Sequence, residues 1–414
     1  MRILVVTLLY APDGGPSASL FAMLCENLVK LGHQVTIISS VPHYPTGQVN
    51  KAYRSKWIQR SIENNVRVIR VRVPSVKRSV LWQRLVQFLI FQFGATYAGL
   101  GEQYEVTLIT NPAIEIALPF LFLSALRHKA TVFFVADVYP DVGIQLGIFR
   151  HRIVIALVNA AEQFCLHKAD YVWIFSEAFR IGMNRMGVPD ERLVVIYSWV
   201  DTEFIQPKPR HNLFSEEYDL NNCFTVLYAG NLGLSQEWDT VLDAAQKVQE
   251  HNSIRFVFVG DGTGRTSLMT KTSEMRLKNV QFIPFQPQSR IPEVLATADI
   301  ALVSLQSGIT SGSIPSKTFS YLASGRPILA LVDKGSDVCI LLQKTNSGVC
   351  ISPNNPDTLV ESILKLVGSS ELREQMASNG RTYVEQHHSP QKAAKKVEAL
   401  LIKAVNQRQN QKHV

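Results

Sequence analysis

The strongest constraint on the fold is a rhythm of apolar runs, polar loops and amphipathic segments that occurs twice along the chain. Residues 3–8 form a continuous apolar run, as expected of a parallel strand buried on both faces. A loop rich in Gly and Pro follows, and apolar positions at helical spacing predict a helix over about residues 17–31. Further strands are expected at 34–39, 66–71, 106–110, 131–135, 171–175 and 193–197, and then at 225–228, 255–259, 280–285, 300–305, 328–332 and 348–351. This alternation predicts α/β domains with doubly wound, Rossmann-like sheets.

The length of the chain and a proline-rich break predict two domains. A chain of 414 residues is too long for one comfortable hydrophobic core. The segment 206–210 contains two prolines, which break any regular element. We therefore expect one domain over 1–205, a second over 206–388, and a basic helix within 389–414 that crosses back to the first domain. Two such domains are expected to face each other across a cleft, with ligands outside the carboxyl ends of the strands.

Composition excludes several classes of protein. With 46% apolar and 18% charged residues, the chain is not expected to be disordered. The five cysteines are scattered without a Cys-x-x-Cys spacing, which is typical of small buried residues in a reducing compartment. Met1 and Arg2 run directly into the first strand, so we expect no secretory leader. No uncharged apolar run reaches the roughly 18–20 residues that a membrane-spanning helix requires. We therefore expect a cytoplasmic protein.

The segment 314–331 carries the most chemical information. A loop rich in Gly and Ser precedes Pro315, a short helix is expected over 316–323, and Gly325 suits its C-terminal end because glycine tolerates positive φ. A helix N-terminus presents unpaired N–H groups and a partial positive charge, which attract phosphate. Ser316 and Lys317 add a hydroxyl and a fixed positive charge at that point. The segment predicts a phosphate site, and an ordinary strand-to-helix connection capped by Ser316 is the alternative.

Other candidate residues lie in loops that follow expected strands. Gly14 and Gly15 come after the first strand, where they would let the backbone approach a phosphate or sugar, or form a plain turn. The segment 230–233, Gly-Asn-Leu-Gly, has the same position in the second domain and leads to Gln236. Asp137 closes a strand of the first domain, where a carboxylate faces the cleft or caps the next helix.

Several signatures are absent from the sequence. A Gly-rich segment, 260–265, follows an expected strand, but Arg265 stands where a dinucleotide fingerprint needs Gly or Ala. There is no Gly-x(4)-Gly-Lys-Ser/Thr loop, no Asp-x-Asp, and no metal-ligand spacing among the ten histidines. We therefore expect no metal site and no bound cofactor.

The order and spacing of these motifs resemble the retaining, nucleotide-sugar-dependent glycosyltransferases of family 4, which have the two-domain GT-B fold. The likeness covers nearly the whole chain. It includes Tyr10-Ala-Pro-x-Gly-Gly, Leu31-Gly-His-Gln-Val-Thr-Ile-Ile, Asp137-x-Tyr-Pro-Asp, Ala169-Asp-Tyr-Val, Val195-Ile-Tyr-Ser-Trp-Val-Asp, Tyr228-Ala-Gly-Asn-Leu-Gly, Phe258-Val-Gly-Asp-Gly, Ala298-Asp-Ile, Pro315-Ser-Lys and Ala323-Ser-Gly-Arg-Pro. The segment 42–47, the Gly-Asn-x-Gly loop and the Pro-Ser-Lys motif look like the branch that builds bacterial surface polysaccharides and lipopolysaccharide.

The resemblance implies transfer of a sugar, with retention, from a nucleotide-diphosphate sugar (a co-substrate) to a glycan or lipid-linked acceptor bound on the first-domain side. A leaving diphosphate needs its charge neutralised, and without a metal this falls to Lys317, N–H groups around Ser316 and the 230–233 loop. Asp137 is expected to orient or deprotonate the acceptor hydroxyl, so Asp137 and Lys317 are the expected catalytic residues. The expected substrate-binding residues are Gly14, Gly15, His43, Gly230, Asn231, Gly233, Gln236, Pro284, Pro315, Ser316 and Ser320.

The chain departs from the family pattern at several positions. Many members carry a Glu-x(7)-Glu pair, whereas this chain has Gly312 and Ser320 there. Asn231 stands where an Arg is common, and Ala136 precedes Asp137 where a His is often found. Two further interpretations therefore stay open: a catalytically silent nucleotide-sugar-binding partner of another transferase, and a nucleotide-sugar epimerase of the same fold.

A basic segment followed by an apolar one predicts attachment to a membrane surface. The segment 51–84 contains a single acidic residue, Glu63, and ten basic residues: Lys51, Arg54, Lys56, Arg60, Arg67, Arg70, Arg72, Lys77, Arg78 and Arg84. Residues 85–97 are then mostly apolar, with Trp82 just upstream, and such a helix suits the interface of an anionic membrane. A buried helix beside a solvated basic strand is the alternative. Nothing resembles a groove-reading motif for nucleic acid. We expect a peripheral enzyme on the inner face of the cytoplasmic membrane.

Overall fold

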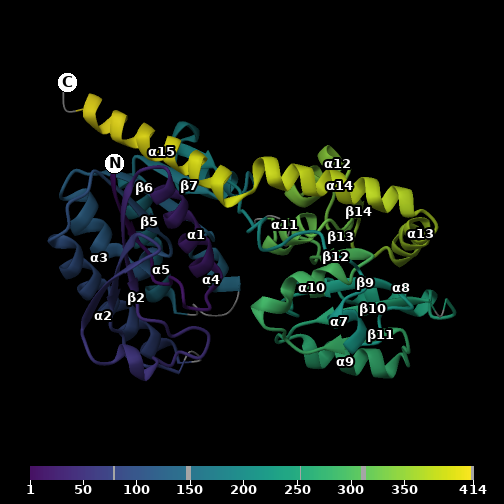
Figure 1. Cartoon of the computed structure of the whole chain (residues 1–414). Helices are drawn as coiled ribbons and strands as arrows, with labels where there is room; N and C mark the ends of the chain where they lie inside the picture. The colour runs from purple at the N-terminus through teal and green to yellow at the C-terminus, as the bar shows by residue number, and fades with distance from the viewer. Residues whose placement is uncertain (78–79, 146–150, 252, 309–313, 412–414) are drawn as a thin grey trace. The chain divides into compact units, whose positions relative to one another are not determined.

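The chain forms two compact α/β units. The computed structural model describes residues 1–77, 80–145, 151–251, 253–308 and 314–411. Its contacts divide the chain into a first unit, Met1–Tyr197 with Pro390–Val414, and a second unit, Ser198–Ser389 (Figure 1). Each unit is built on one largely parallel sheet with helices between its strands. The prediction of two doubly wound, Rossmann-like sheets is thereby confirmed.

The sheet of the first unit has the strand order β3-β4-β2-β1-β5-β6-β7-β8. Its strands are β1 Arg2–Val6, β2 Gln34–Ser40, β3 Ile58–Glu63, β4 Val66–Val71, β5 Val106–Thr110, β6 Ala130–Val135, β7 Tyr171–Ile174 and β8 Leu193–Val195. All of them pair in parallel except β3, which runs antiparallel to β4. The central strand β1 is apolar because both of its faces are covered, and Val5 lies opposite Ile37 and Leu108.

Helices cover both faces of this sheet. They are α1 Pro16–Lys30, α2 Leu81–Leu100, α3 Ala117–Pro119, α4 Asp141–Gln145, α5 Arg152–Lys168, α6 Phe179–Arg185 and α15 Pro390–Asn410. Short 3-10 helices are η1 Lys51–Tyr53, η2 Ala113–Glu115 and η4 Asp190–Arg192, and η3 Phe120–Ala125 is a π-helix. On one face, Phe91 of α2, Phe120 of η3 and Cys165 of α5 share a core with Leu4 of β1. Helices α1 and α15 contact each other, and Arg408 of α15 forms an ion pair of 2.9 Å with Asp170.

The sheet of the second unit has the order β11-β10-β9-β12-β13-β14 and is parallel throughout. Its strands are β9 Phe224–Ala229, β10 Ile254–Val259, β11 Val280–Ile283, β12 Ile300–Ser304, β13 Ile328–Leu331 and β14 Gly348–Ile351. Its helices are α7 Leu213–Glu217, α8 Asp239–Lys247, α9 Arg265–Glu274, α10 Ile291–Ala296, α11 Ser316–Ala323, α12 Asp337–Thr345, α13 Pro356–Val367 and α14 Ser370–His387, with the turn η5 Gln288–Arg290. The carboxyl ends of β9, β10, β11 and β12 therefore share one edge.

Strand β3 was not expected from the sequence, and it changes how the basic segment is understood. Its residues, Ile-Gln-Arg-Ser-Ile-Glu, lack the apolar pattern of a buried strand because β3 is an edge strand. Glu63 at its end forms a bidentate pair with Arg70 of β4, whose side chain is only 3% exposed. Counting Arg70 among the membrane-binding cations was therefore wrong. Arg78 lies outside the described residues.

The division between the units falls at Tyr197 and Ser198, eight residues before the proline-rich segment that we expected to separate them. Residues 198–205 belong with the second unit because α14 holds them. Arg381 donates to the carbonyl oxygens of Thr202 and Ile205 at 2.9 and 2.7 Å. The N–H of Val200 donates to the carbonyl of His388 at 3.0 Å. These long-range contacts, rather than the prolines of 206–210, therefore set the boundary between the two units.

No helix among the residues that the structure describes has both the length and the apolar character needed to cross a membrane.

Candidate active site

The second unit contains a cavity of about 380 Å³ at the carboxyl edge of its sheet. The loops after β9, β10 and β11 line it together with α10 and α11. Its lining residues include Gly230, Asn231, Gln236, Gly260, Phe285, Gln286, Ser316, Lys317, Ser320 and Tyr321. Six of these residues were predicted from the sequence, and they come from segments up to 90 residues apart. The sheet topology therefore gathers them into one site.

Two glycine-rich loops pack against each other to form the floor of this cavity. Gly230 adopts φ +139° and Gly260 adopts φ +137°. A side chain on Gly260 would place its Cβ 2.1 Å from the carbonyl oxygen of Gly230, so only glycine fits there. The N–H of Leu232 also donates to the carbonyl of Asp261 at 2.9 Å. The glycines of 260–264 thus serve close backbone packing, which explains their pattern without a dinucleotide.

Helix α11 begins at the wall of the cavity. It spans Ser316–Ala323, as predicted, and Gly325 follows it with φ +66°. Its first residue comes directly after Pro315, and no side chain caps its first turn. The ordinary N-cap proposed as the alternative for Ser316 is therefore not formed. Ser316 is exposed, so its hydroxyl and the first-turn N–H groups are available to an anion.

Lys317 is the most unusual charge in the cavity. Among the residues that the structure describes, no carboxylate pairs with it. Its ammonium lies 3.6 Å from the centroid of the Tyr228 ring, over the ring face. Burial without a counter-charge lowers the pKa of Lys317 to about 7. An anionic group beside Lys317 would stabilise its charged form, so the geometry suits the binding of an anion.

Two tyrosines fix Lys317 to the Gly230 loop. The hydroxyl of Tyr228 donates to the carbonyl of Asn231 at 2.8 Å, while its ring supports the ammonium. The hydroxyl of Tyr321, one turn after Lys317, accepts the N–H of Ala229 at 2.8 Å. Both tyrosines are fully buried. The loop and the helix therefore form one rigid support for the lysine.

Three predicted residues of this unit do not line the cavity. Gly233 lies beside it, where its N–H donates to Oε1 of Gln236 at 2.8 Å. Pro284 connects β11 to the cavity residue Phe285, and its carbonyl accepts from Gln286 at 3.1 Å. Pro315 directly precedes α11. Gly312, one of the two positions of the missing Glu-x(7)-Glu pair, lies outside the described residues.

In the first unit, the loop after β1 is tied to the loop after β2. The buried carboxylate of Asp13 accepts the N–H groups of His43 and Tyr44, each at 3.0 Å. His43 is buried, and its Nδ1 lies 3.0 Å from the carbonyl oxygen of Val41. Gly14 is exposed beside these residues, and a side chain on Gly15 would collide with Leu9. Sequence reasoning missed Asp13, although an Asp before Gly-Gly in such a loop is a signal for a turn.

Asp137 follows β6 at the same edge of the first sheet. Asn111 after β5 holds its backbone, since Nδ2 of Asn111 donates to the carbonyl of Asp137 at 2.6 Å and Oδ1 accepts the N–H of Ala136 at 2.9 Å. The Asp137 side chain is exposed, yet surrounding protein partly desolvates it and raises the pKa of its carboxyl. No hydrogen bond in the described part of the chain shows this carboxylate as a helix cap, which was the alternative for it.

A second carboxyl group near this edge was not predicted. Glu162 of α5 is buried, and it accepts the N–H of Ala113 at 2.7 Å. Burial raises the pKa of Glu162 to about 8, and the negative charge of Glu115 adds to the shift. Glu162 lies in a largely apolar helical segment, and nothing in that segment of the sequence signals a buried carboxyl group with a raised pKa. Tyr139 lies within the electrostatic reach of both Glu162 and Asp137.

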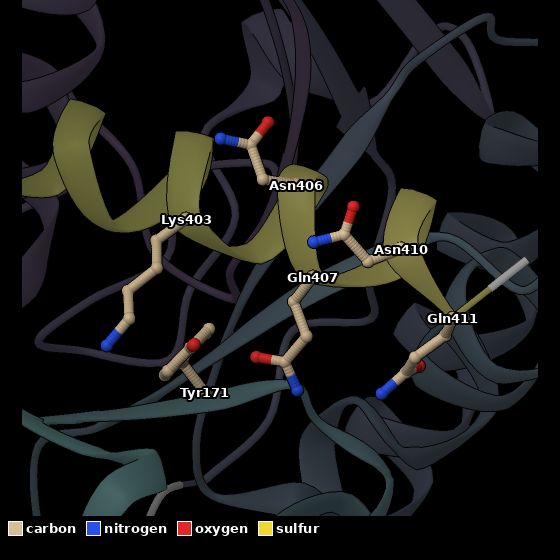
Figure 2. Close-up of a pocket in the computed structure, with 6 residues that line it drawn as sticks. All are labelled: Tyr171, Lys403, Asn406, Gln407, Asn410 and Gln411. Carbon is tan, nitrogen blue, oxygen red and sulfur yellow. The ribbon is translucent and has the colours of Figure 1, made fainter. Parts of the chain in front are cut away.

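A larger hollow of about 720 Å³ lies elsewhere on the first unit (Figure 2). Tyr171 and side chains of α15 line it, and the ammonium of Lys403 lies 4.6 Å from the centroid of the Tyr171 ring. Tyr171 is the first residue of β7, so this hollow lies at the amino edge of the sheet. Its amides, from Asn406, Gln407, Asn410 and Gln411, offer no acid, base or nucleophile (Figure 2). None of the site residues predicted from the sequence lines this hollow, whereas six of them line the cavity at the carboxyl edge of the second sheet.

A metal centre has no support in the described ranges of the chain. They contain no group of three or more His, Cys, Asp or Glu side chains that could hold a metal ion.

Comparison with known proteins defines the class of the chain. The model of the glycosyl transferase 4-like domain matches residues 14–199, and that of glycosyl transferases group 1 matches residues 214–383. The chain belongs to these glycosyltransferases, which have the GT-B fold.

Individual relatives agree with this class. The putative colanic acid biosynthesis glycosyl transferase WcaI of Escherichia coli K12 is 26% identical over 373 residues, covering 88% of this chain and 91% of WcaI. The probable glycosyltransferase WbjE of Pseudomonas aeruginosa is 27% identical over 293 residues, which cover 70% of this chain and 73% of WbjE. Among solved structures, Anabaena HepE in complex with UDP matches with a TM-score of 0.71 at 14% identity, and the match covers 97% of this chain and 100% of HepE.

Proposed function

We propose that this protein transfers a sugar from a nucleotide-diphosphate sugar to a glycan or lipid-linked acceptor in the biosynthesis of a bacterial surface polysaccharide. The observation that carries the proposal is the Lys317 ammonium, which no carboxylate of the described residues pairs, beside a helix start and a glycine loop in the second unit. The similarity to WcaI, a putative colanic acid biosynthesis glycosyl transferase, supports the polysaccharide context.

In this proposal the cavity of the second unit holds the donor nucleotide. The diphosphate lies against Lys317, Ser316 and the Gly230 loop, where charge and N–H donors meet. The exposed ring of Phe285, two residues after β11, offers a stacking face to the base. HepE was solved with UDP and also with UDP-glucose, which makes a UDP-sugar the first donor to test.

The chemistry follows from the same charges. The bond between the anomeric carbon and the diphosphate oxygen breaks, and negative charge develops on that oxygen. Pre-aimed positive groups stabilise this charge without reorganisation, so we propose that no divalent metal is required. The acceptor oxygen bonds to the anomeric carbon, and Asp137 orients the hydroxyl or takes its proton. Retention at the anomeric carbon is proposed from the shared motifs of the family-4 enzymes.

We also propose that the enzyme works at the inner face of the cytoplasmic membrane. Several cations of the basic segment, including Lys51, Lys56 and Lys77, are exposed. Lipid-linked acceptors lie at such a surface, and each exposed cation near anionic lipid contributes about 1 kcal/mol of attraction.

A panel of labelled nucleotide sugars tests the proposal. Each donor is incubated with the protein and with membrane extract as a source of acceptor, and transfer, hydrolysis and binding are scored separately. Transfer of one sugar supports the proposal. Binding without transfer or hydrolysis, under conditions where a related transferase is active, would support the silent partner, for which Ser320 in place of an acid is the motivating feature. Interconversion of the donor sugar would identify an epimerase.

A further inference from the structure

The outer surface of α2 is an apolar stripe that runs along the whole helix. Its six members are Trp82, Val86, Leu89, Phe93, Tyr97 and Leu100, which are 65%, 41%, 51%, 65%, 72% and 45% exposed. Their spacing of three or four residues places them on one side of the helix. The opposite side carries Phe88, Phe91 and Ala95 into the core. We refer to these six residues as the α2 stripe.

The apolar surface extends beyond α2. The neighbouring π-helix η3 contacts α2, and it contributes Phe122, which is 41% exposed. Leu126, directly after η3, is 58% exposed. A monomeric soluble protein rarely exposes an apolar surface formed by eight large side chains on adjacent elements. Such a surface needs an occupant.

Charge identifies the occupant. Within α2 there is no acidic residue, and Arg84 lies on its first turns. Beyond the C-terminal end of α2, a guanidinium nitrogen of Arg127 donates to the carbonyl of Leu100 at 2.6 Å, and Lys129 lies close by over the Tyr104 ring. Glu102, just beyond the C-terminal end of α2, is paired with Arg67 at 3.3 Å. Apolar side chains bordered by cations match a bilayer of anionic lipid.

The basic loop 51–56 joins the other end of the stripe. Gln87 of α2 donates to the carbonyl of Pro74 at 2.9 Å. The next residue, Ser75, accepts the N–H of Val49 at 3.0 Å, and Arg54 donates to the carbonyl of Val49 at 2.8 Å. These bonds fix the loop that carries Lys51 and Lys56 beside the first half of α2. Cations therefore lie near both ends of α2.

We propose that α2 is the membrane-docking element of this protein, lying flat in the interface of an anionic bilayer with its stripe among the acyl chains. The inference rests on the proposed location at a membrane and adds which surface makes the contact. A helix of 20 residues is about 30 Å long, so in-plane docking inserts all six stripe residues at a similar depth. Trp82 and Tyr97 each have an apolar ring with a polar group, which suits the polar–apolar boundary where an in-plane helix lies.

Flotation with vesicles of phosphatidylglycerol and phosphatidylethanolamine, compared with phosphatidylcholine alone, tests this assignment. The full chain is expected to float with the anionic vesicles at low salt, and less at high salt. The double substitution Leu89→Ser with Phe93→Ser is expected to lower partitioning at least tenfold. The matched control, Ile62→Ser with Ile340→Ser, changes side chains that are 74% and 53% exposed elsewhere, and it is expected to float like the wild type. An unchanged melting temperature shows that each variant is folded.

The possible outcomes distinguish the role of α2 as the docking element from the proposed location at a membrane. If the wild type floats and the α2 variant floats equally well, α2 is not the docking element although the membrane location stands. If the wild type does not float at all, the membrane location itself is wrong, while the donor site is untouched. If the wild type is a dimer without lipid and the α2 variant is a monomer that no longer self-associates, the stripe is a protein interface and our assignment is overturned. A blue shift of Trp82 fluorescence on vesicle addition, absent in Trp82→Phe, would support it directly.

Discussion

Replacing Lys317 by Met is expected to stabilise the protein while removing its catalytic activity. The methionine retains the length and apolar stem of the lysine but carries no charge. In the wild type the ammonium is partly buried beside Tyr228, with no carboxylate of the described residues paired to it, and this burial lowers the pKa of Lys317 from 10.5 to about 7. Folding therefore costs free energy that the uncharged side chain does not require.

The size of the effect follows from linkage. At about 1.36 kcal/mol per pKa unit, this difference corresponds to roughly 4 kcal/mol at pH 7. Solvent reaches part of the side chain, and the Tyr228 ring stabilises the cation by about 1 kcal/mol, so we expect about 2 kcal/mol for the substitution. For a unit of this size that corresponds to a rise of about 4–8 °C in melting temperature.

The free-energy penalty of burying the charged Lys317 depends on pH in a defined direction. Because the folded pKa is lowered, the penalty is fully present below pH 7, and it is relieved as the pH rises from about 7 towards 10.5. The stability difference between Lys317→Met and the wild type should therefore shrink, by roughly half, between pH 6 and pH 9.

Thermal denaturation of both proteins across this pH range, with and without UDP, is the assay. UDP should raise the melting temperature of the wild type more than that of the variant. Transfer activity should fall about 100-fold or more, the size typical of one lost charge stabiliser. A variant that is less stable than the wild type at pH 6, or whose difference does not depend on pH, would refute the account of Lys317 as an unpaired buried cation.

Three further predictions concern other parts of the site. Asp137→Asn should lower kcat about 100-fold with little change in melting temperature, whereas a loss of about 1 kcal/mol of stability at normal rate would show a helix cap. Gly260→Ala should destabilise the second unit by about 3 kcal/mol, because the new Cβ would lie 2.1 Å from the carbonyl oxygen of Gly230. The control Gly335→Ala has a similar positive φ of +89° but open space around the new Cβ, so it should cost only about 1 kcal/mol. Equal melting temperatures of the two variants would contradict the packing argument. Activity should survive excess EDTA, and its abolition with rescue by magnesium would show that a metal neutralises the diphosphate.

Much of the fold could be predicted because local sequence carries it. Buried parallel strands are continuous apolar runs, so those of both sheets were found with errors of one or two residues at their ends. The bounds of α11 were predictable because Pro315 and Gly325 mark both of its ends. The edge strand β3 was not, since a solvent-facing strand rich in polar residues has no such pattern.

The candidate site could be predicted only in part, for the same reason. Gly230, Asn231 and Lys317 stand out because each lies in a loop with a recognisable chemical pattern. The contact of Lys317 with the Tyr228 ring joins residues 89 positions apart, and nothing local announces it.

Histidine 388 shows the same limit of local reasoning. His388 ends a polar helix, α14, yet it is only 3% exposed. Its ring centroid lies 4.3 Å from that of Phe319, and its Nδ1 lies 2.9 Å from the carbonyl oxygen of Ser198. Tertiary packing decides such positions.

The most direct test of the central claim is calorimetric titration of the wild type and of Lys317→Met with UDP at pH 6 and pH 8.5. We predict one site in the wild type, with affinity falling about tenfold or more at the higher pH as Lys317 loses its proton. The variant should bind more weakly at pH 6, and its affinity should change less between the two values. Equal affinity of both proteins at both pH values would contradict the assignment of Lys317 to the diphosphate, and with it the proposed donor site.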